Sequence, residues 1–481
     1  TGGFGAEYRN ARSGVINVVT KEGSKDTSSG SISFRHSNPS KKHFGLSPYD
    51  EESFWFKPYM DDEVCWTGTN NGSWDEYKQR QYPSFDGWNS ISEQTLLDDD
   101  PDNDLTPSGA KKLFTWEHRK DGQIQFPDIN FDAGFGGPVP FISSRFGNLR
   151  FFVSARQEQD MYLYEVSSPG LYRQSYLLKL TSDISKKSKL TYTYYSGNME
   201  GTTLSRGGGT SIVNDVWDLA SEVNSTGFTM PWRLFTNEYW SPTKIQNSTH
   251  GLKYTNSLTS DSYFDLLLKV DLKEYTTGHG ARRDTSTSYS IFGSGENEWF
   301  ADEAPVGFFG SPLFSVEGRL AFGGAISTSR DSSIVSSYTI KGNYTKQINN
   351  NNQLKMGGEF ILSSLDLKYG SQNEFLPSGN YWSLMNVNPY RLSFFAQDKL
   401  EYKGFVAIAG LNLDVINPNG EWYVVDLYED DFFSSNYTSS EEGTFEKIKL
   451  DTQIELSPRL AISHPITETS KLYFNYGHYQ Q

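Results

Sequence analysis

The chain of 481 residues is acidic, with a formal net charge of −16, and 36% of its residues are hydrophobic although 15% are aromatic. A chain this acidic is a poor candidate for nucleic-acid binding. Its aromatic content argues against disorder, because disordered chains are poor in aromatic residues. The single cysteine, Cys65, excludes an internal disulfide framework. No apolar run approaches the roughly 18–20 residues that a membrane-spanning helix requires.

Short stretches in which apolar and polar residues alternate recur along the chain and predict β-strands. The clearest stretch runs from 263 to 275, with an apolar face of Phe264, Leu266, Leu268, Val270 and Leu272 and a polar face of Asp265, Lys269, Asp271 and Lys273. In chain order, thirteen strands are predicted near 30–37, 128–136, 149–158, 174–183, 189–197, 251–259, 263–275, 336–347, 353–365, 391–402, 405–414, 456–464 and 470–478.

The connections between these strands alternate between two lengths. The shorter links are 137–148, 184–188, 260–262, 348–352, 403–404 and 465–469, and the longer ones are 38–127, 159–173, 198–250, 276–335, 366–390 and 415–455. This alternation is typical of an all-β fold, a transmembrane antiparallel up-and-down β-barrel with short periplasmic turns and long extracellular loops. We therefore expect the apolar face of 263–275 to contact lipid and its polar face to line the lumen. Because thirteen strands leave an unpaired edge, we also expect further strands beyond this chain.

All eleven tryptophans fall in the long connections. One interpretation is that these loops fold into compact caps with small tryptophan cores; the other is that the tryptophans are anchors for a ligand or partner. The candidate binding residues are Trp66, Trp74, Trp88, Trp232, Trp240 and Trp422. Residues 38–127 and 415–455 each carry a net charge of −8. Aromatic anchors combined with this acidic field favour cationic or calcium-bridged ligands, and carbohydrates stacked on indole faces, over anionic iron chelates.

An acidic run within the first long loop places Asp98, Asp100, Asp102 and Asp104 at alternate positions. This spacing resembles a calcium site, but it lacks the glycine and glutamate of an EF-hand loop. A solvated acidic loop is the alternative interpretation. No other cofactor and no firm metal site are indicated. The chain shows no catalytic constellation, so we do not expect an enzyme.

Residues 6–23, AEYRNARSGVINVVTKEG, resemble the end of the plug domain of TonB-dependent outer-membrane transporters. The matching positions are Tyr8, Ala11, Gly14, Val15, Ile16, Asn17, Thr20, Lys21 and Gly23. Residues 393–414 and 456–478 are similar to barrel hairpins of the SusC- and Oar-like branch of that family. The resemblance implies that 1–25 end a plug domain and that 26–481 form part of a barrel that has 22 strands in the family.

The resemblance also implies a function and partners. It implies import of an oligopeptide, glycan or chelated metal across the outer membrane of a Gram-negative bacterium. Energy would come from the TonB–ExbB–ExbD complex, through an N-terminal segment outside this chain. It leaves open a surface lipoprotein lid. Plug residues Arg9 and Arg12 would be held by acidic residues of the lumen. The alternative is a barrel that does not transport, used as an adhesin or as a structural subunit of an envelope assembly.

Overall fold

A computed structural model of the chain describes residues 5–7, 19–40, 45–47, 49–54, 56–97, 99, 104–117, 125–162, 166–203, 240–280, 288–290, 299–301, 327–372, 380–424, 446–467 and 470–478. Among these residues, no helix has both the length and the apolar character needed to cross a membrane.

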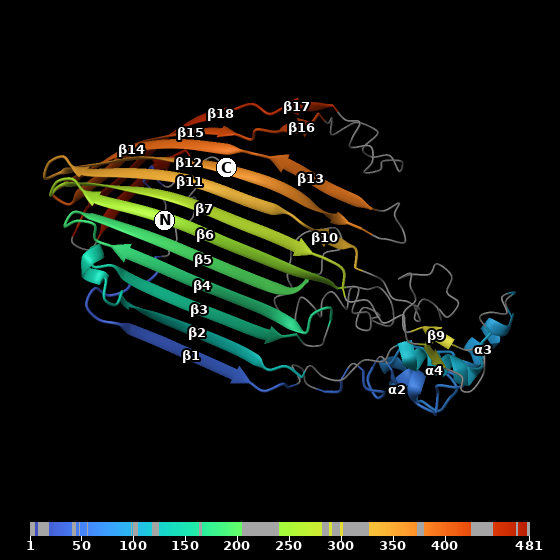
Figure 1. Cartoon of the computed structure of the whole chain (residues 1–481). Helices are drawn as coiled ribbons and strands as arrows, with labels where there is room; N and C mark the ends of the chain where they lie inside the picture. Colours follow the sequence, from blue (N-terminus) through green and yellow to red (C-terminus); the bar gives the residue numbers. More distant parts are fainter. Residues whose placement is uncertain are drawn as a thin grey trace.

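Thirteen long strands form one antiparallel sheet in which each strand pairs with its neighbours in the chain (Figure 1). They are β1 (Ser29–Ser37), β2 (Asp128–Pro138), β3 (Arg150–Met161), β4 (Gly170–Ser182), β5 (Ser188–Thr203), β6 (Ser241–Ser257), β7 (Ser262–Thr277), β11 (Ile334–Gln347), β12 (Asn352–Ser371), β14 (Tyr390–Tyr402), β15 (Phe405–Asn417), β18 (Gln453–Pro465) and β19 (Lys471–Gly477). Each predicted strand overlaps one of these strands. The predicted antiparallel up-and-down sheet is therefore confirmed.

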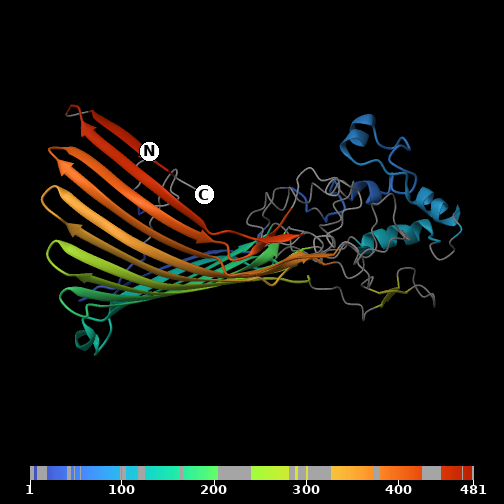
Figure 2. The same cartoon turned by 90° about the horizontal axis from the view of Figure 1, so that it is seen from above.

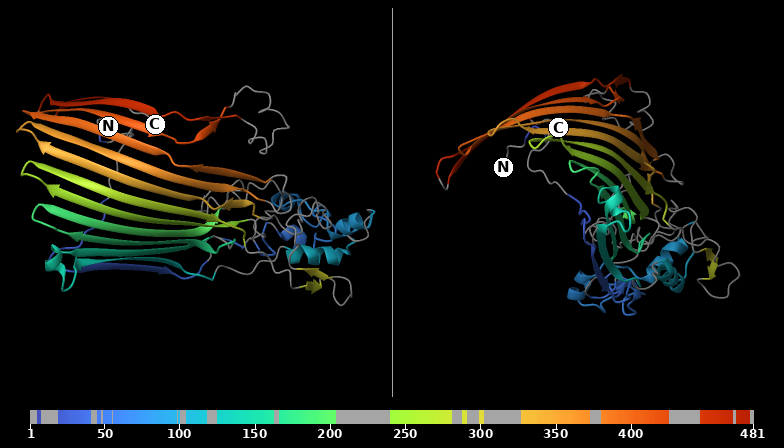
Figure 3. Two further views of the ribbon diagram at one scale, coloured as in Figure 1. Left: turned by 45° about the horizontal axis from the view of Figure 1, so that its top comes forward. Right: turned by 60° about the vertical axis from the view of Figure 1, so that its left-hand side comes forward.

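The sheet curves into an arc like part of a barrel wall, with β1 and β19 as its two edges among the described strands (Figures 2 and 3). The tightest turn joins β14 to β15 through Lys403 and Gly404, whose φ angles of 47° and 86° are both left-handed. Two successive left-handed residues fit the twist of a two-residue hairpin. The turn between β2 and β3 holds a short 3₁₀ helix, η2 (Ser143–Phe146). All the short turns lie at one end of the wall, as the connection lengths predict (Figure 1).

Several strands at the other end were not predicted. β6 begins at Ser241, ten residues before the predicted start, because 241–250 is polar on both faces and carries no alternation signal. β10 (Ser329–Asp331) and β13 (Tyr381–Val387) extend the sheet beside β12. Two separate hairpins pair β8 (Ser288–Ser290) with β9 (Trp299–Ala301), and β16 (Glu421–Tyr423) with β17 (Lys447–Lys449).

The long connection between β1 and β2 folds into helices that the sequence analysis did not predict. They are α1 (Lys57–Met60), α2 (Glu76–Gln81), α3 (Trp88–Leu97) and α4 (Pro107–Glu117). The described residues between 49 and 117, here called the cap, lie beyond the long-loop end of the wall (Figure 2). The chain leaves and re-enters the sheet at two paired residues, Ser37 and Asp128.

The two faces of the wall are identified by strand register, because residues opposite each other in a ladder point to the same side. Residues 5–7 lie against the concave face, where Glu7 pairs with Lys355 of β12. Glu359 shares that face and pairs with Lys341 at 3.4 Å, and Lys341 stands opposite Leu267 of β7. The residues at odd positions 265–273 are therefore concave and those at even positions 264–272 convex. The predicted division of this strand between two faces is confirmed.

Candidate functional site

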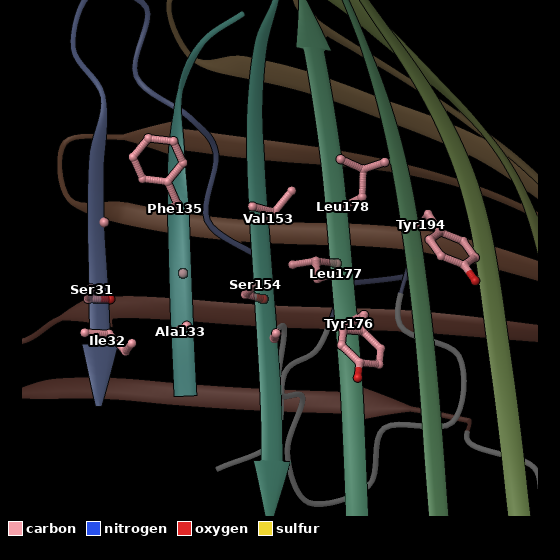
Figure 4. Close-up of a pocket in the computed structure, with 13 residues that line it drawn as sticks. Ser31, Ile32, Ala133, Phe135, Val153, Ser154, Tyr176, Leu177, Leu178 and Tyr194 are labelled. Carbon is pink, nitrogen blue, oxygen red and sulfur yellow. The ribbon is translucent and has the colours of Figure 1, made fainter. Parts of the chain in front are cut away.

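The convex face is apolar and exposed. Leu266, Leu268, Val270 and Leu272 of β7 are between 36% and 41% exposed. On β1 to β5, a groove of about 700 Å³ lies among outward side chains that include Phe135, Tyr176 and Tyr194 (Figure 4). Apolar side chains that remain exposed over a whole sheet face are what lipid contact requires. The exposed apolar side chains of the convex face agree with the expectation that this face contacts lipid. Lipid contact itself stays a prediction.

The concave face carries the N-terminal segment, which is attached at two places. The first attachment, here called the linker anchor, lies at the short-turn end of β3 to β5. The Arg150 side chain is 4% exposed and donates from Nε to Glu22 Oε1 at 2.6 Å. It also pairs with Asp183 at 3.3 Å, and Asp183 pairs with Lys25 at 2.6 Å. Lys189 pairs with Glu22 at 3.5 Å. The buried guanidinium is thus neutralised from both the segment and the wall.

Asp183 lies in the turn after β4 and has a shifted pKa. Burial raises the pKa of this carboxyl, but the hydrogen bond from Lys25 and the charge of Arg150 outweigh burial, so the net pKa is below its ordinary value of 3.8. Both cations favour the ionised carboxylate. Asp183 is therefore ionised at neutral pH.

The second attachment lies across the arc on β12, β14 and β15. The backbone N–H of Ala6 donates to Gln397 Oε1 at 2.8 Å, and Asn412 Nδ2 donates to the Ala6 carbonyl at 3.1 Å. A Cβ added at Gly410 would lie 2.8 Å from the Ala6 Cβ, so glycine permits this close approach. We call this contact the far-wall anchor. Arg9 and Arg12, predicted to contact the lumen, lie outside the described residues.

Two of the cap tryptophans whose burial is described, Trp74 and Trp88, are part of a buried core. Trp88 is fully buried, and its Nε1 donates to the Tyr59 carbonyl at 2.9 Å. Phe85 and Phe114 pack on the Trp88 ring with centroid separations of 4.9 and 5.4 Å. Trp74 is 2% exposed. The compact-cap interpretation accounts for both tryptophans, because their rings are enclosed by the cap's own side chains.

The remaining candidate tryptophans differ in exposure. Trp240, at the start of β6, is fully buried, whereas Trp422 on β16 is 54% exposed. Trp66 is half-buried, with Lys111 Nζ 4.9 Å from its ring centroid. Trp232 lies outside the described residues. An anchoring role thus stays a prediction, and Trp422 has the most accessible side chain of the three that are described.

The proposed calcium ligands fall mostly outside the described residues. Of the four aspartates, Asp104 is described and is exposed. Asp98, Asp100 and Asp102 are not described. Within the described part of the chain, no group of three or more His, Cys, Asp or Glu residues could hold a metal ion.

Sequence reasoning missed a second cavity, which lies on the concave face of β3 to β7. It is lined by thirteen residues that include Arg156, Arg173 and Lys273. Each of these cations sits at a concave position of its own strand, but they are between 17 and 117 residues apart in the chain. The available signal was a basic residue at the same alternation phase in three strands, β3, β4 and β7. Only the register brings the three together.

Comparison with known proteins identifies similar structures. No family model and no curated protein sequence matches the chain. Among solved structures, the FrpB iron transporter from Neisseria meningitidis is 12% identical, with a TM-score of 0.41 over 73% of this chain and 43% of that one. The ferric citrate transporter FecA is 12% identical, with a TM-score of 0.42 over 73% and 41%.

The ferric-catecholate import receptor Fiu of E. coli is 11% identical, with a TM-score of 0.42 over 74% of this chain and 53% of that one. The likeness is one of fold. In each case the chain spans only about half, or less, of the length of the structure it matches.

Proposed function

We propose that this chain is part of an outer-membrane transporter of the TonB-dependent class. The observation that carries the proposal is the N-terminal segment, which is attached to the concave side of a wall whose convex side is apolar. Residues 1–25 would be the end of a plug and residues 26–481 part of the barrel. The sequence of residues 6–23 supports this division.

The nature of the two anchors suits a plug that must move. Both rest mainly on hydrogen bonds or ion pairs, so water entering the lumen can solvate most of the groups that separate. A segment held by apolar burial would instead expose hydrophobic area at about 25 cal/mol per Å² when it left. When TonB, with ExbB and ExbD, pulls on the plug, it therefore has to break separate polar contacts between the N-terminal segment and the wall.

The function that follows is energised import across the outer membrane of a Gram-negative bacterium. Substrate would bind from the long-loop side, and displacement of the plug would open a path along the concave face. No covalent step is involved. Oligopeptides, glycans and chelated metals are the candidate substrates, and a surface lipoprotein lid is compatible with the long loops.

The test combines uptake with a reversible lock. Ala6→Cys and Gly410→Cys place two thiols at the far-wall anchor, where the two Cβ atoms would lie close enough for a disulfide after a small shift. Cells carrying the chain are given labelled oligopeptides, glycans and chelated iron. We expect one label to accumulate only with an intact proton-motive force, to stop on oxidation of the double variant, and to resume on reduction.

Each single-cysteine variant is the control, because it cannot form this disulfide. Uptake that continues through the locked protein would contradict a moving plug. An adhesin or structural subunit would show a different result: no label would accumulate, and removing the chain would impair adhesion or envelope assembly.

A further inference from the structure

We infer that the cavity on the concave face of β3 to β7, here called the wall pocket, binds a small oxyanionic ligand through carboxylate or phosphate oxygens. Its volume of about 570 Å³ is in the range of small-molecule sites. The inference deepens the proposed function by naming a substrate class. The oxyanion inference rests on the proposed transport function in one respect, namely that substrate passes along the concave face.

The shape of the wall pocket follows from one row of residues across five strands. The register aligns Arg156, Ser175, Gly197, Asn247 and Lys273 on β3, β4, β5, β6 and β7. The middle of this row is small, and the long cationic side chains stand at its ends. A Cβ at Gly197 would overlap the Asn247 side-chain oxygen and lie 2.9 Å from the Tyr195 hydroxyl. Glycine therefore keeps the floor of the pocket low.

The width of the pocket suits a ligand larger than a single anion. Four strand spacings of about 4.8 Å separate the backbones of β3 and β7, or about 19 Å in all. The long side chains of Arg156 and Lys273 can extend inward from these two ends. A ligand with more than one oxyanion group could therefore contact both.

The charges that line the pocket are mainly positive. Glu158 is the acidic group of the lining, and its Oε2 lies 3.4 Å from Arg173 Nη1 and 3.8 Å from Arg156 Nη2. One carboxylate is thus shared by two guanidinium groups, and Lys273 adds a third cation. The Arg156 side chain is 56% exposed, so it can still present N–H donors. A guanidinium carries five such donors in a planar fork that matches carboxylate and phosphate oxygens.

Two neighbouring acidic groups on the same face, Asp271 and Asp132, are not among the residues that line the pocket. Asp271 pairs with Lys269 at 2.7 Å and accepts a hydrogen bond from Thr249 at 2.8 Å. Asp132 stands opposite Arg156 on β2, outside the residues that line the pocket. Tyr195 and Asn247 add neutral donors inside it. The pocket therefore presents cations to a ligand although the chain as a whole is acidic.

The experiment measures binding to the full 481-residue chain in detergent by calorimetry. The probes are tricarballylate, a tricarboxylate, and pyrophosphate, each at low and raised salt. We expect at least one probe to bind, and to bind more weakly as salt screens the cations. A preference for tricarballylate indicates a carboxylate ligand, and a preference for pyrophosphate indicates a phosphate ligand.

Two variants with opposite expected effects test the site itself. Arg156→Gln removes a charged donor and should weaken binding about tenfold. Glu158→Gln removes the negative charge that both guanidinium groups share and should strengthen binding several-fold, a gain that a merely structural role of Glu158 would not produce. Lys341→Gln removes a concave-face lysine remote from the pocket and is the matched control, with no change expected.

Two results would overturn the inference. One is that neither probe binds; the other is that binding ignores both pocket variants, which would place the anion elsewhere. The measurement needs no energy source, so it separates the two proposals. Probe binding without energised uptake would refute the proposed transport function and would still support oxyanion binding in the wall pocket. Uptake of a neutral or cationic substrate without probe binding would refute only the oxyanion inference.

Discussion

The cap and the wall are built on different physical principles, although both belong to one acidic chain. The cap has a core of aromatic rings, with Tyr59, Trp88 and Phe114 almost completely excluded from water. The wall has no comparable core, because the described strands expose apolar side chains on one face and polar side chains on the other. It is held by the backbone ladder. Substitutions should therefore act by packing in the cap and by face in the wall.

The two regions also differ in charge. The connection 38–127, which includes the cap, carries −8, whereas the wall pocket is lined by three cations and one carboxylate. The acidic loops alone favour cationic ligands, but the wall pocket favours anionic ones. The net charge of a chain sets the electrostatic field far from the molecule, whereas strand register sets which charged side chains line a pocket.

Removing an aromatic ring from the cap should have the largest effect. Trp88→Ala deletes a fully buried indole and should destabilise the cap by about 3–5 kcal/mol. Limited proteolysis should then cleave within residues 49–117 while the wall keeps its heat-modifiable mobility on gels. Tyr77→Ala is the control, because Tyr77 is 77% exposed. Loss of the folded wall along with the cap would contradict the separation of the two regions.

A charge on the convex face should come next. Leu268→Arg places a guanidinium on the lipid side and should cost about 2–4 kcal/mol if it lies near the bilayer midplane. Leu267→Arg, one residue away on the same strand, points to the concave face and should be tolerated. Denaturant titration in lipid vesicles measures both. Equal destabilisation by the two variants would show that the faces are assigned wrongly.

Weakening the linker anchor should have a smaller and local effect. Arg150→Gln leaves Glu22 and Asp183 without their shared cation, and we expect a loss of about 1–3 kcal/mol. The N-terminal segment should then exchange its amide hydrogens faster around residues 19–27, with β12 to β15 unchanged. Lys189→Gln is the control, since the Lys189 side chain is 44% exposed and its pair with Glu22 is long. Unaltered amide hydrogen exchange in Arg150→Gln would show that the linker anchor does not hold the N-terminal segment.

Acidification should produce the smallest effect, at the same anchor. The folded-state pKa of Asp183 lies below its ordinary value of 3.8, so its stabilising contribution is complete above that value and is lost as pH falls through the lowered pKa. Hydrogen exchange of residues 19–27 should therefore be constant from pH 7 to about 5 and rise only below about 4. Asp183→Asn should abolish this acid-dependent part. A rise already at pH 6 would implicate a different group.

The sequence predicted the wall well because its signal is local. In 263–275 the alternation alone assigns each side chain to a face, and the structure agrees with that assignment. Alternation did not predict residues 241–250 of β6, because this part of the strand has no apolar face. It also failed in the cap, because the aromatic residues of 53–114 follow neither a period of two nor a sustained helical period. Their burial depends on contacts between Tyr59, Phe85 and Phe114, which are distant in sequence.

The candidate site was predictable only in outline. The resemblance at residues 6–23 predicted that an N-terminal segment lies within the wall, and the contacts of Ala6 and Glu22 place parts of it on the concave face. The partners on the wall could not be named, because they depend on which residues of distant strands share a row. Gln397 and Arg150 carry no mark in the sequence that separates them from other polar strand residues.

The attachment of the cap at the paired residues Ser37 and Asp128 has an evolutionary consequence. For the sheet, the connection from β1 to β2 is a hairpin that starts and ends at paired residues, whatever the length of the inserted segment. Loop-closure entropy grows only logarithmically, at about 0.6 kcal/mol for each doubling of the loop. A cap of another size or sequence could therefore replace this one with little change to the ladder. Natural selection could thus vary the cap at the long-loop end without altering the concave face and its anchors.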